Sequence, residues 1–107
     1  MIVIFTALAL AFGAVGATAG QASVQPIKIG AVLALSGDVA VYGIPQRRGL
    51  ELARDTINAQ GGVLGRPIEL IFEDSRGERQ SAINAVQKLI NRDRVLAMIG
   101  PSLTAEM

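Results

Sequence analysis

Residues 27–35 have the sequence IKIGAVLAL, a nearly unbroken apolar run of the length of one β-strand. A strand that is buried on both faces has this character, because helices cover both sides of a parallel sheet. The run ends at residues 36–38 in Ser-Gly-Asp, a combination that is typical of a turn. This stretch therefore predicts a central strand of an α/β protein.

Two helices and two further strands are expected after this first strand. A helix is predicted over about residues 45–60, where apolar side chains recur at helical spacing and Gly61 follows as a stop signal. A strand is predicted over 68–73, whose alternating apolar and acidic side chains suit a position nearer the sheet edge. A second helix is expected over about 78–91, and a third, fully apolar strand over 95–99.

The first helix carries a predicted buried face. Pro45 is expected in its first turn, where proline is well tolerated. The apolar residues that recur at i, i+3 and i+7 are Leu50, Ala53 and Ile57, and we expect them to pack on the sheet. Asn58 is expected to point elsewhere.

The order strand, helix, strand, helix, strand predicts a parallel sheet. The first and third strands are the most apolar and are expected to be central, so the simplest spatial order is 2-1-3. Right-handed crossovers then place the two helices on opposite faces of the sheet. This is the start of a doubly wound α/β lobe, with a switch point beside the first strand. Ligands bind outside the carboxyl ends of the strands at such a point, which selects the loops 36–44 and 100–104.

The composition excludes several classes of function. The 107 residues include no Cys and no His and carry a net charge of +1. Disulfides, thiol chemistry and His-based zinc sites are therefore not expected within this segment. No basic run with interleaved aromatic residues is present, so a nucleic-acid partner is not expected. We predict no metal ligands, no cofactor and no catalytic residues.

A Rossmann-type enzyme is the alternative interpretation of the fold. Its dinucleotide fingerprint, G-x-G-x-x-G, belongs at the first strand-to-helix turn, where this chain has only Gly37 and Gly43. The glycine-rich stretch 61–65 follows a helix rather than a strand, and no G-x-x-x-x-G-K-[ST] motif for phosphate occurs. These mismatches disfavour such an enzyme.

The N-terminal segment has the character of an export signal. Residues 2–19 contain no charged side chain, and an apolar core is followed by small residues that end in an A-x-A site at 17–19. We predict a signal peptide over 1–19, cleaved after Ala19 or failing that after Ala22, and a location in the periplasm. The basic residue expected near the start of a signal is missing, and a retained membrane anchor is the alternative.

Three side chains in the two selected loops are candidates for ligand contact. Tyr42 is the only aromatic residue of the first loop and is expected either to pack over the sheet edge or to form a wall of the ligand pocket. Ser102 and Thr104 follow the third strand, where hydroxyls often cap the next helix. Free N–H groups and a hydroxyl at such a helix start also suit a carboxylate, and the two roles are compatible.

The chain resembles the periplasmic solute-binding proteins of ABC transporters, in the branched-chain (Leu/Ile/Val) amino acid-binding group. The resemblance covers residues 27–107, and the matching stretches are IKIG at 27–30, LSG at 35–37, Tyr42-Gly43, INAQGGVLG at 57–65, and IGPS at 99–102 with Thr104. It implies a two-lobed type I periplasmic binding protein, not an enzyme, that closes over its ligand and is a monomer when complete. Such a protein captures an aliphatic amino acid, an amide or a similar small solute and delivers it to an inner-membrane ABC permease.

The resemblance also implies which residues bind the ligand. Tyr42 would line the cleft, the Thr104 hydroxyl would hold the α-carboxylate of the ligand, and Ser102 and Leu103 would flank it. After a linker over 20–26, residues 27–107 would form only an incomplete first lobe, so we expect the chain to be an N-terminal fragment. The alternative from a different class is the ligand-sensing domain of a receptor or regulator with the same fold.

Overall fold

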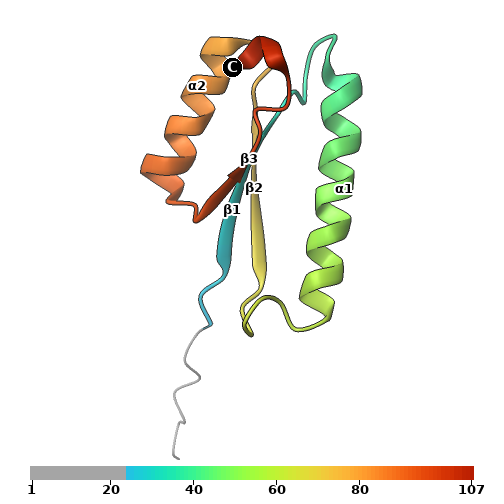
Figure 1. Cartoon of the computed structure of the whole chain (residues 1–107), viewed down its shortest axis with the longest axis vertical. Helices are drawn as coiled ribbons and strands as arrows, with labels where there is room; N and C mark the ends of the chain where they lie inside the picture. The colour runs from blue at the N-terminus through green and yellow to red at the C-terminus, as the bar shows by residue number, and fades with distance from the viewer. Residues whose placement is uncertain (1–23) are drawn as a thin grey trace, which may run out of the picture.

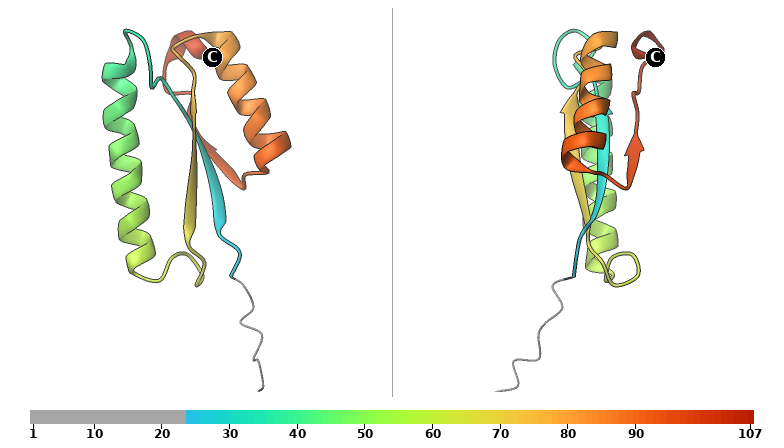
Figure 2. Two further views of the ribbon diagram at one scale, coloured as in Figure 1. Left: turned by 180° about the vertical axis from the view of Figure 1, so that it is seen from behind. Right: turned by 90° about the vertical axis from the view of Figure 1, so that its left-hand side faces the viewer.

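The computed structural model describes residues 24–107 and contains a three-stranded parallel sheet. The strands are β1 (Ile27–Leu33), β2 (Ile68–Asp74) and β3 (Ala97–Ile99). Their spatial order is β2-β1-β3, with β1 in the middle (Figures 1 and 2). The predicted fold class and strand order are therefore confirmed.

Two helices flank this sheet on opposite faces, as the right-handed crossovers predict (Figure 1). Helix α1 is Ala40–Ala59, and helix α2 is Arg79–Lys88 and continues into the π-helical turn Leu89–Asp93. A short 3-10 turn, Thr104–Glu106, follows β3 and lies near the N-terminal end of α2 (Figure 1). The carboxyl ends of all three strands thus face the same side of the molecule.

The best-packed part of the core lies between β1 and α2. Val32 packs there with Ala82, Ala85 and Leu89, all of them buried. Gly30 lies on the same face of β1, and a Cβ atom at Gly30 would come within 2.7 Å of the Leu89 side chain. The small residues on both elements therefore let α2 approach the sheet closely.

The other face of the sheet is covered by α1. The predicted face residues Leu50, Ala53 and Ile57 line a small cavity against the sheet, which confirms that this side of the helix faces inward. The prediction for Asn58 is wrong, because its amide group accepts a hydrogen bond from the Ile68 N–H and donates one to the Ile68 carbonyl. The N–H and carbonyl groups of Ile68, the first residue of β2, have no partner on β1. The Asn58 side chain supplies the hydrogen bonds that both groups need.

Helix α1 begins five residues earlier than predicted, at Ala40 rather than Pro45. Pro45 lies inside the helix, where it cannot donate to the carbonyl of Val41. Val41 is exposed, so water can satisfy that carbonyl. Gly43 permits the early start, because a Cβ atom there would lie 1.8 Å from the Ala34 carbonyl oxygen. Tyr42 consequently lies on the first turn of α1 and not in a loop.

Strand β3 is shorter than the predicted 95–99, and it lies at one end of the described sheet, as the predicted order 2-1-3 requires. Pairing with β1 begins at the Leu96 N–H, which donates to the Lys28 carbonyl at 2.8 Å. All three residues of Ala97–Ile99 are nevertheless exposed. No strand within residues 24–107 covers the far edge of β3, so its apolar side chains remain uncovered.

The predicted signal peptide over 1–19 and most of the predicted linker over 20–26 lie outside the described residues. Within residues 24–107, neither helix is long and apolar enough to cross a membrane. The prediction of a signal peptide therefore stays a prediction.

Candidate functional site

Two loops come together at the carboxyl edge of the sheet, where the sequence predicts ligand binding. The loop after β1 leads directly into α1, whose first turn is held against the strand end by the close approach of Gly43 to Ala34. The loop after β3 begins at Gly100, where a Cβ atom would lie 2.2 Å from the Val32 carbonyl oxygen. Both loops are thus packed tightly against the end of β1.

A cavity of about 490 Å³ opens between α1 and the loop after β3. Its lining comes from the end of β1, from one side of α1 and from the first residues after β3. The lining residues are Leu33, Gln46, Gly49, Leu50, Ile99, Gly100, Pro101 and Ser102.

The cavity is mainly apolar, with two side chains that can form hydrogen bonds, those of Gln46 and Ser102. The Ser102 hydroxyl is buried and has no hydrogen-bond partner within the described part of the chain. A Cβ atom at Gly49 would meet no atom within 4 Å, so there is free space beside this glycine on the side of α1 that lines the cavity. An aliphatic group with one polar end fits this lining, since buried polar atoms require partners.

The structure brings only some of the predicted site residues together. Ser102 lines the cavity, and Leu103 follows it in a half-buried position. Thr104 is exposed at the start of the 3-10 turn and is not part of the cavity lining. Tyr42 is 61% exposed and is not among the residues that line this cavity. Neither Ser102 nor Thr104 caps the turn with its side chain.

Sequence reasoning missed Gln46 because it placed the start of the helix at Pro45 and treated the preceding residues as a loop. With the helix beginning at Ala40, Tyr42, Gln46 and Gly49 are spaced i, i+4 and i+7 and share one side of α1. The pattern was present in the sequence. The close approach of Gly43 to β1, which fixes the helix start, was not visible there.

Asp74, the last residue of β2, fastens the loop after β1. Its carboxylate accepts hydrogen bonds from the Leu35 N–H at 2.9 Å, from the Ser36 hydroxyl and from the Arg76 N–H at 2.8 Å. Burial alone would raise the pKa of Asp74. The hydrogen bonds, led by that of Ser36, outweigh burial and hold this pKa below its ordinary value of 3.8. Asp74 therefore remains ionised and keeps its hold on the loop at neutral pH.

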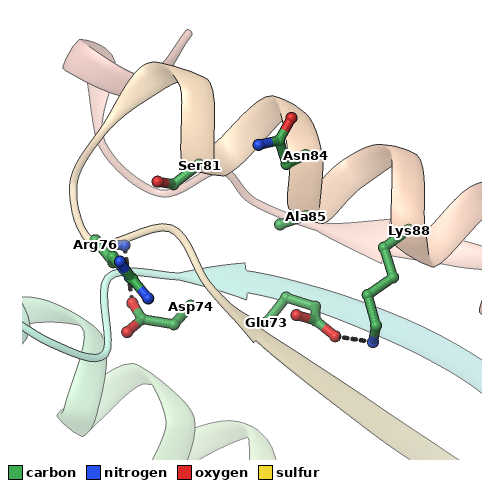
Figure 3. A pocket seen from close by; sticks show the side chains of 7 residues that line it. All are labelled: Glu73, Asp74, Arg76, Ser81, Asn84, Ala85 and Lys88. Atoms are coloured by element: carbon green, nitrogen blue, oxygen red, sulfur yellow. Dashed lines mark hydrogen bonds and ion pairs between the residues drawn. The ribbon is translucent and has the colours of Figure 1, made fainter.

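A second cavity, of about 340 Å³, opens between the end of β2 and α2 (Figure 3). Two of its charged side chains, those of Glu73 and Lys88, form an ion pair. Lys88 reaches back to Glu73 and also contacts Asp93, and these hydrogen bonds raise the pKa of Lys88 above its ordinary value of 10.5. The remaining lining residues are Asp74, Arg76, Ser81, Asn84 and Ala85. This cavity offers no unpaired, buried polar atom and is not the candidate site.

No group of three or more His, Cys, Asp or Glu side chains within residues 24–107 is placed to hold a metal ion. None of the residues that line the larger cavity is ionisable. Arg47 binds Glu51 at 3.0 Å and lies over the ring of Phe72, 4.8 Å from its centroid. The candidate site is therefore a largely uncharged cavity at the carboxyl edge of the sheet.

Comparisons with known proteins find similar proteins whose names describe amino acid-binding or transporter substrate-binding proteins. The chain is 39% identical over 93 residues to a Leu/Ile/Val-binding protein homolog (homolog 7) of Brucella abortus, covering 87% of this chain and 23% of that protein. The structure superposes with a TM-score of 0.74 and 35% identity on the branched-chain amino acid transporter substrate binding protein LivJ of Streptococcus pneumoniae, in complex with isoleucine. That match covers 77% of this chain and 24% of LivJ.

An ABC transporter substrate-binding protein of Sphaerobacter thermophilus is 46% identical, with a TM-score of 0.69, over 77% of this chain and 22% of that protein. The chain thus spans less than a quarter of the length of each of these relatives. A sequence model of the family described as "Periplasmic binding protein" matches residues 26–107, which is the whole sheet with both helices. The chain belongs to the periplasmic binding protein family.

Proposed function

We propose that this chain forms the beginning of the first lobe of a two-lobed, extracytoplasmic solute-binding protein. The full-length protein, which the whole reading frame would encode, captures an aliphatic amino acid or a similar small solute and delivers it to an ABC permease in the inner membrane. It is a binding protein and not an enzyme. The observation that carries this proposal is the apolar cavity of about 490 Å³ at the carboxyl edge of the sheet, beside the loop after β3.

The apolar part of the ligand is proposed to occupy this cavity. Leu33, Leu50, Ile99 and Pro101 supply an aliphatic lining. Burying apolar surface there is favourable by about 25 cal/mol per Å². The Ser102 hydroxyl, which has no hydrogen-bond partner among residues 24–107, offers one hydrogen bond at the polar end of such a ligand. Relatives whose names specify Leu/Ile/Val or isoleucine support this choice of solute.

The polar end of the ligand is proposed to bind at Leu103 and Thr104. The Thr104 hydroxyl is exposed, and the first N–H groups of the turn that begins there have no acceptor within the turn. Neither segment beside the cavity, 36–44 or 100–104, contains Lys or Arg. A carboxylate there must rely on N–H and hydroxyl donors, which suits a zwitterion that carries its own positive charge.

Tyr42 and the second lobe are proposed to complete the cleft. Tyr42 projects from the same side of α1 as Gln46 and is largely exposed, so it is available to a ligand that lies above the cavity. Groups for the ligand ammonium would come from parts of the full-length protein outside this chain.

Calorimetric titration of the full-length protein tests this function. The panel is leucine, isoleucine, valine, an aliphatic amide and urea. We expect saturable heat with at least one of the three aliphatic amino acids. Binding of urea or of the amide, with no binding of the three amino acids, would show that the solute is not an aliphatic amino acid. The absence of heat with every member of the panel would contradict the proposal.

A further inference from the structure

Glu106 is a buried carboxylate without an ion-pair partner among residues 24–107. Only 2% of the residue is exposed, and none of the ion pairs of the described residues includes it. A buried charge is unfavourable unless hydrogen-bond donors satisfy it. The hydrogen-bond donors that surround the Glu106 carboxylate therefore identify the segments of the chain that this side chain connects.

Two donors from different loops meet at the Glu106 carboxylate. The Ser75 hydroxyl, which is fully buried, donates to one carboxylate oxygen. The Leu103 N–H donates to the other oxygen at 3.2 Å, and the Glu106 N–H donates back to the Leu103 carbonyl at 3.0 Å. Glu106 thus closes the turn that contains Thr104 and ties it to the loop after β2.

Ser75 is itself anchored to the central strand. Its N–H donates to the carbonyl of Leu33, the last residue of β1, at 2.9 Å. Its hydroxyl oxygen also accepts a hydrogen bond from the Gly77 N–H at 3.3 Å. The connection therefore runs from the end of β1 through Ser75 and Glu106 to Leu103, and neither Ser75 nor Glu106 is among the residues that line the cavity.

We propose that Ser75 and Glu106, together the Ser75–Glu106 clasp, are positioning residues that hold the loop after β3 in its ligand-binding conformation. This inference rests on the proposed function, because that loop carries Ser102 and Thr104. A loop that is already ordered loses less conformational entropy when the ligand binds. The clasp thus favours affinity without contacting the ligand.

Three variants of the full-length protein separate the hydrogen bonds from the charge. Ser75→Ala and Glu106→Ala each break the clasp. Glu106→Gln keeps it, since the amide oxygen can accept from the Leu103 N–H while the amide nitrogen donates to the Ser75 hydroxyl oxygen. We expect Ser75→Ala and Glu106→Ala to raise the Kd for the bound amino acid about tenfold, as the loss of a hydrogen bond to a charged group implies. The Kd of Glu106→Gln for the same amino acid should stay within about threefold of the wild-type Kd.

A matched control pair lies on α2. The Ser81 hydroxyl donates to the Glu78 carboxylate at 3.2 Å, which repeats the chemistry of the clasp on an exposed surface. Neither side chain lines the larger cavity, and neither forms a hydrogen bond with residues 100–106. We expect Ser81→Ala and Glu78→Ala to bind the amino acid as the wild-type protein does.

Hydrogen exchange of the ligand-free protein gives a second readout. In Ser75→Ala the Leu103 N–H still has its Glu106 acceptor, so faster exchange across residues 102–106 reports the loss of the clasp itself. We expect that acceleration in this segment, with unchanged protection in β1 and in the buried side of α2.

The possible outcomes distinguish the inference from the function on which it rests. If the wild-type protein binds no solute of the panel, the proposed function fails. Hydrogen exchange at residues 102–106 then still tests whether the clasp holds the loop after β3. If wild type binds and Ser75→Ala and Glu106→Ala bind equally well, the clasp is overturned. Unchanged exchange at residues 102–106 in Ser75→Ala, or equal weakening by the control pair, overturns it as well.

Discussion

Asp74 fastens the loop after β1 with a carboxylate whose folded-state pKa lies below its ordinary value of 3.8. A carboxyl group of this kind stabilises the folded state above its unfolded pKa, and that contribution is lost as the pH falls through the lower, folded pKa. The loop that leads into α1 should therefore be held firmly at neutral pH and released in acid.

We predict that Asp74→Asn lowers the free energy of unfolding of the full-length protein by about 1 kcal/mol at pH 7, because an amide cannot accept all three hydrogen bonds. The difference from wild type should begin to shrink as the pH falls below the unfolded-state pKa of about 4, and it should be lost as the pH falls through the lower, folded-state pKa, where the wild-type carboxylate becomes protonated. Urea unfolding between pH 7 and pH 3 measures both effects. Asp55→Asn, which alters an exposed pair with Arg54, is the control and should change stability by less than about 0.5 kcal/mol. A difference that is constant down to pH 3 would contradict the role of the charge.

Two glycines of α1 should respond in opposite ways to the same substitution. A Cβ atom at Gly43 would lie 1.8 Å from the Ala34 carbonyl oxygen, whereas one at Gly49 would meet nothing within 4 Å. We predict that Gly43→Ala destabilises the full-length protein by about 1–3 kcal/mol, through a forced backbone shift. Gly49→Ala should stabilise it by about 0.5–1 kcal/mol, as alanine does inside a helix. Denaturant unfolding without ligand checks both, and equal effects at the two sites would be inconsistent with the early helix start.

At the level of elements, the open edge of β3 is the weak point of this chain taken alone. Leu96 is 74% exposed, Met98 and Ile99 are exposed as well, and no strand of residues 24–107 pairs with the far edge. Unpaired, apolar strand edges are sites of association between chains.

We therefore predict that residues 24–107 expressed alone associate and lack a cooperative unfolding transition. Size-exclusion chromatography and a thermal scan followed by circular dichroism provide the test. Replacing Leu96 and Met98 by Lys should reduce the association, since charged side chains block edge pairing. A monomer with a sharp thermal transition in the unmodified fragment would show that this edge needs no partner.

The sheet was predictable because its signals are local. The apolar run at 27–35 and the alternation at 68–73 indicate a central strand and a more peripheral one, which suggests the order β2-β1-β3. Right-handed crossovers then place the two helices on opposite faces. The start of α1 was not predictable in this way. Pro45 is a frequent first residue of a helix, and only the tight contact between Gly43 and Ala34 shows that the helix has already begun.

The candidate site was predictable only in its location. The sequence selected the loop after β3 and Ser102, which does line the cavity. It could not find Gln46, whose place depends on the helix start, nor the contact of Ser75 with Glu106, which lie 31 residues apart. Contacts of this kind depend on the three-dimensional arrangement of loops and leave no periodic pattern in the sequence.

At the level of the whole molecule, the proposed extracytoplasmic location depends on export of the protein. The proposal of an extracytoplasmic binding protein requires that the segment before β1 directs secretion. We predict cleavage after Ala19, or failing that after Ala22, because small residues precede both positions. Intact mass of the product from the periplasmic fraction checks this. Recovery of the uncleaved chain in the membrane fraction would argue for an anchored protein instead.

We propose that the loop after β3 holds the carboxylate of an aliphatic amino acid, and calorimetric titration of Thr104→Ala in the full-length protein is the sharpest test of this claim. The ligand is whichever of leucine, isoleucine and valine binds the wild type most tightly. The control is Thr56→Ala, which removes an exposed hydroxyl bonded to the Leu52 carbonyl on α1. We predict that Thr104→Ala weakens binding roughly 10- to 150-fold, the loss of one hydrogen bond to a charged group, while Thr56→Ala binds as wild type does. Equal affinity of Thr104→Ala and wild type would contradict the claim.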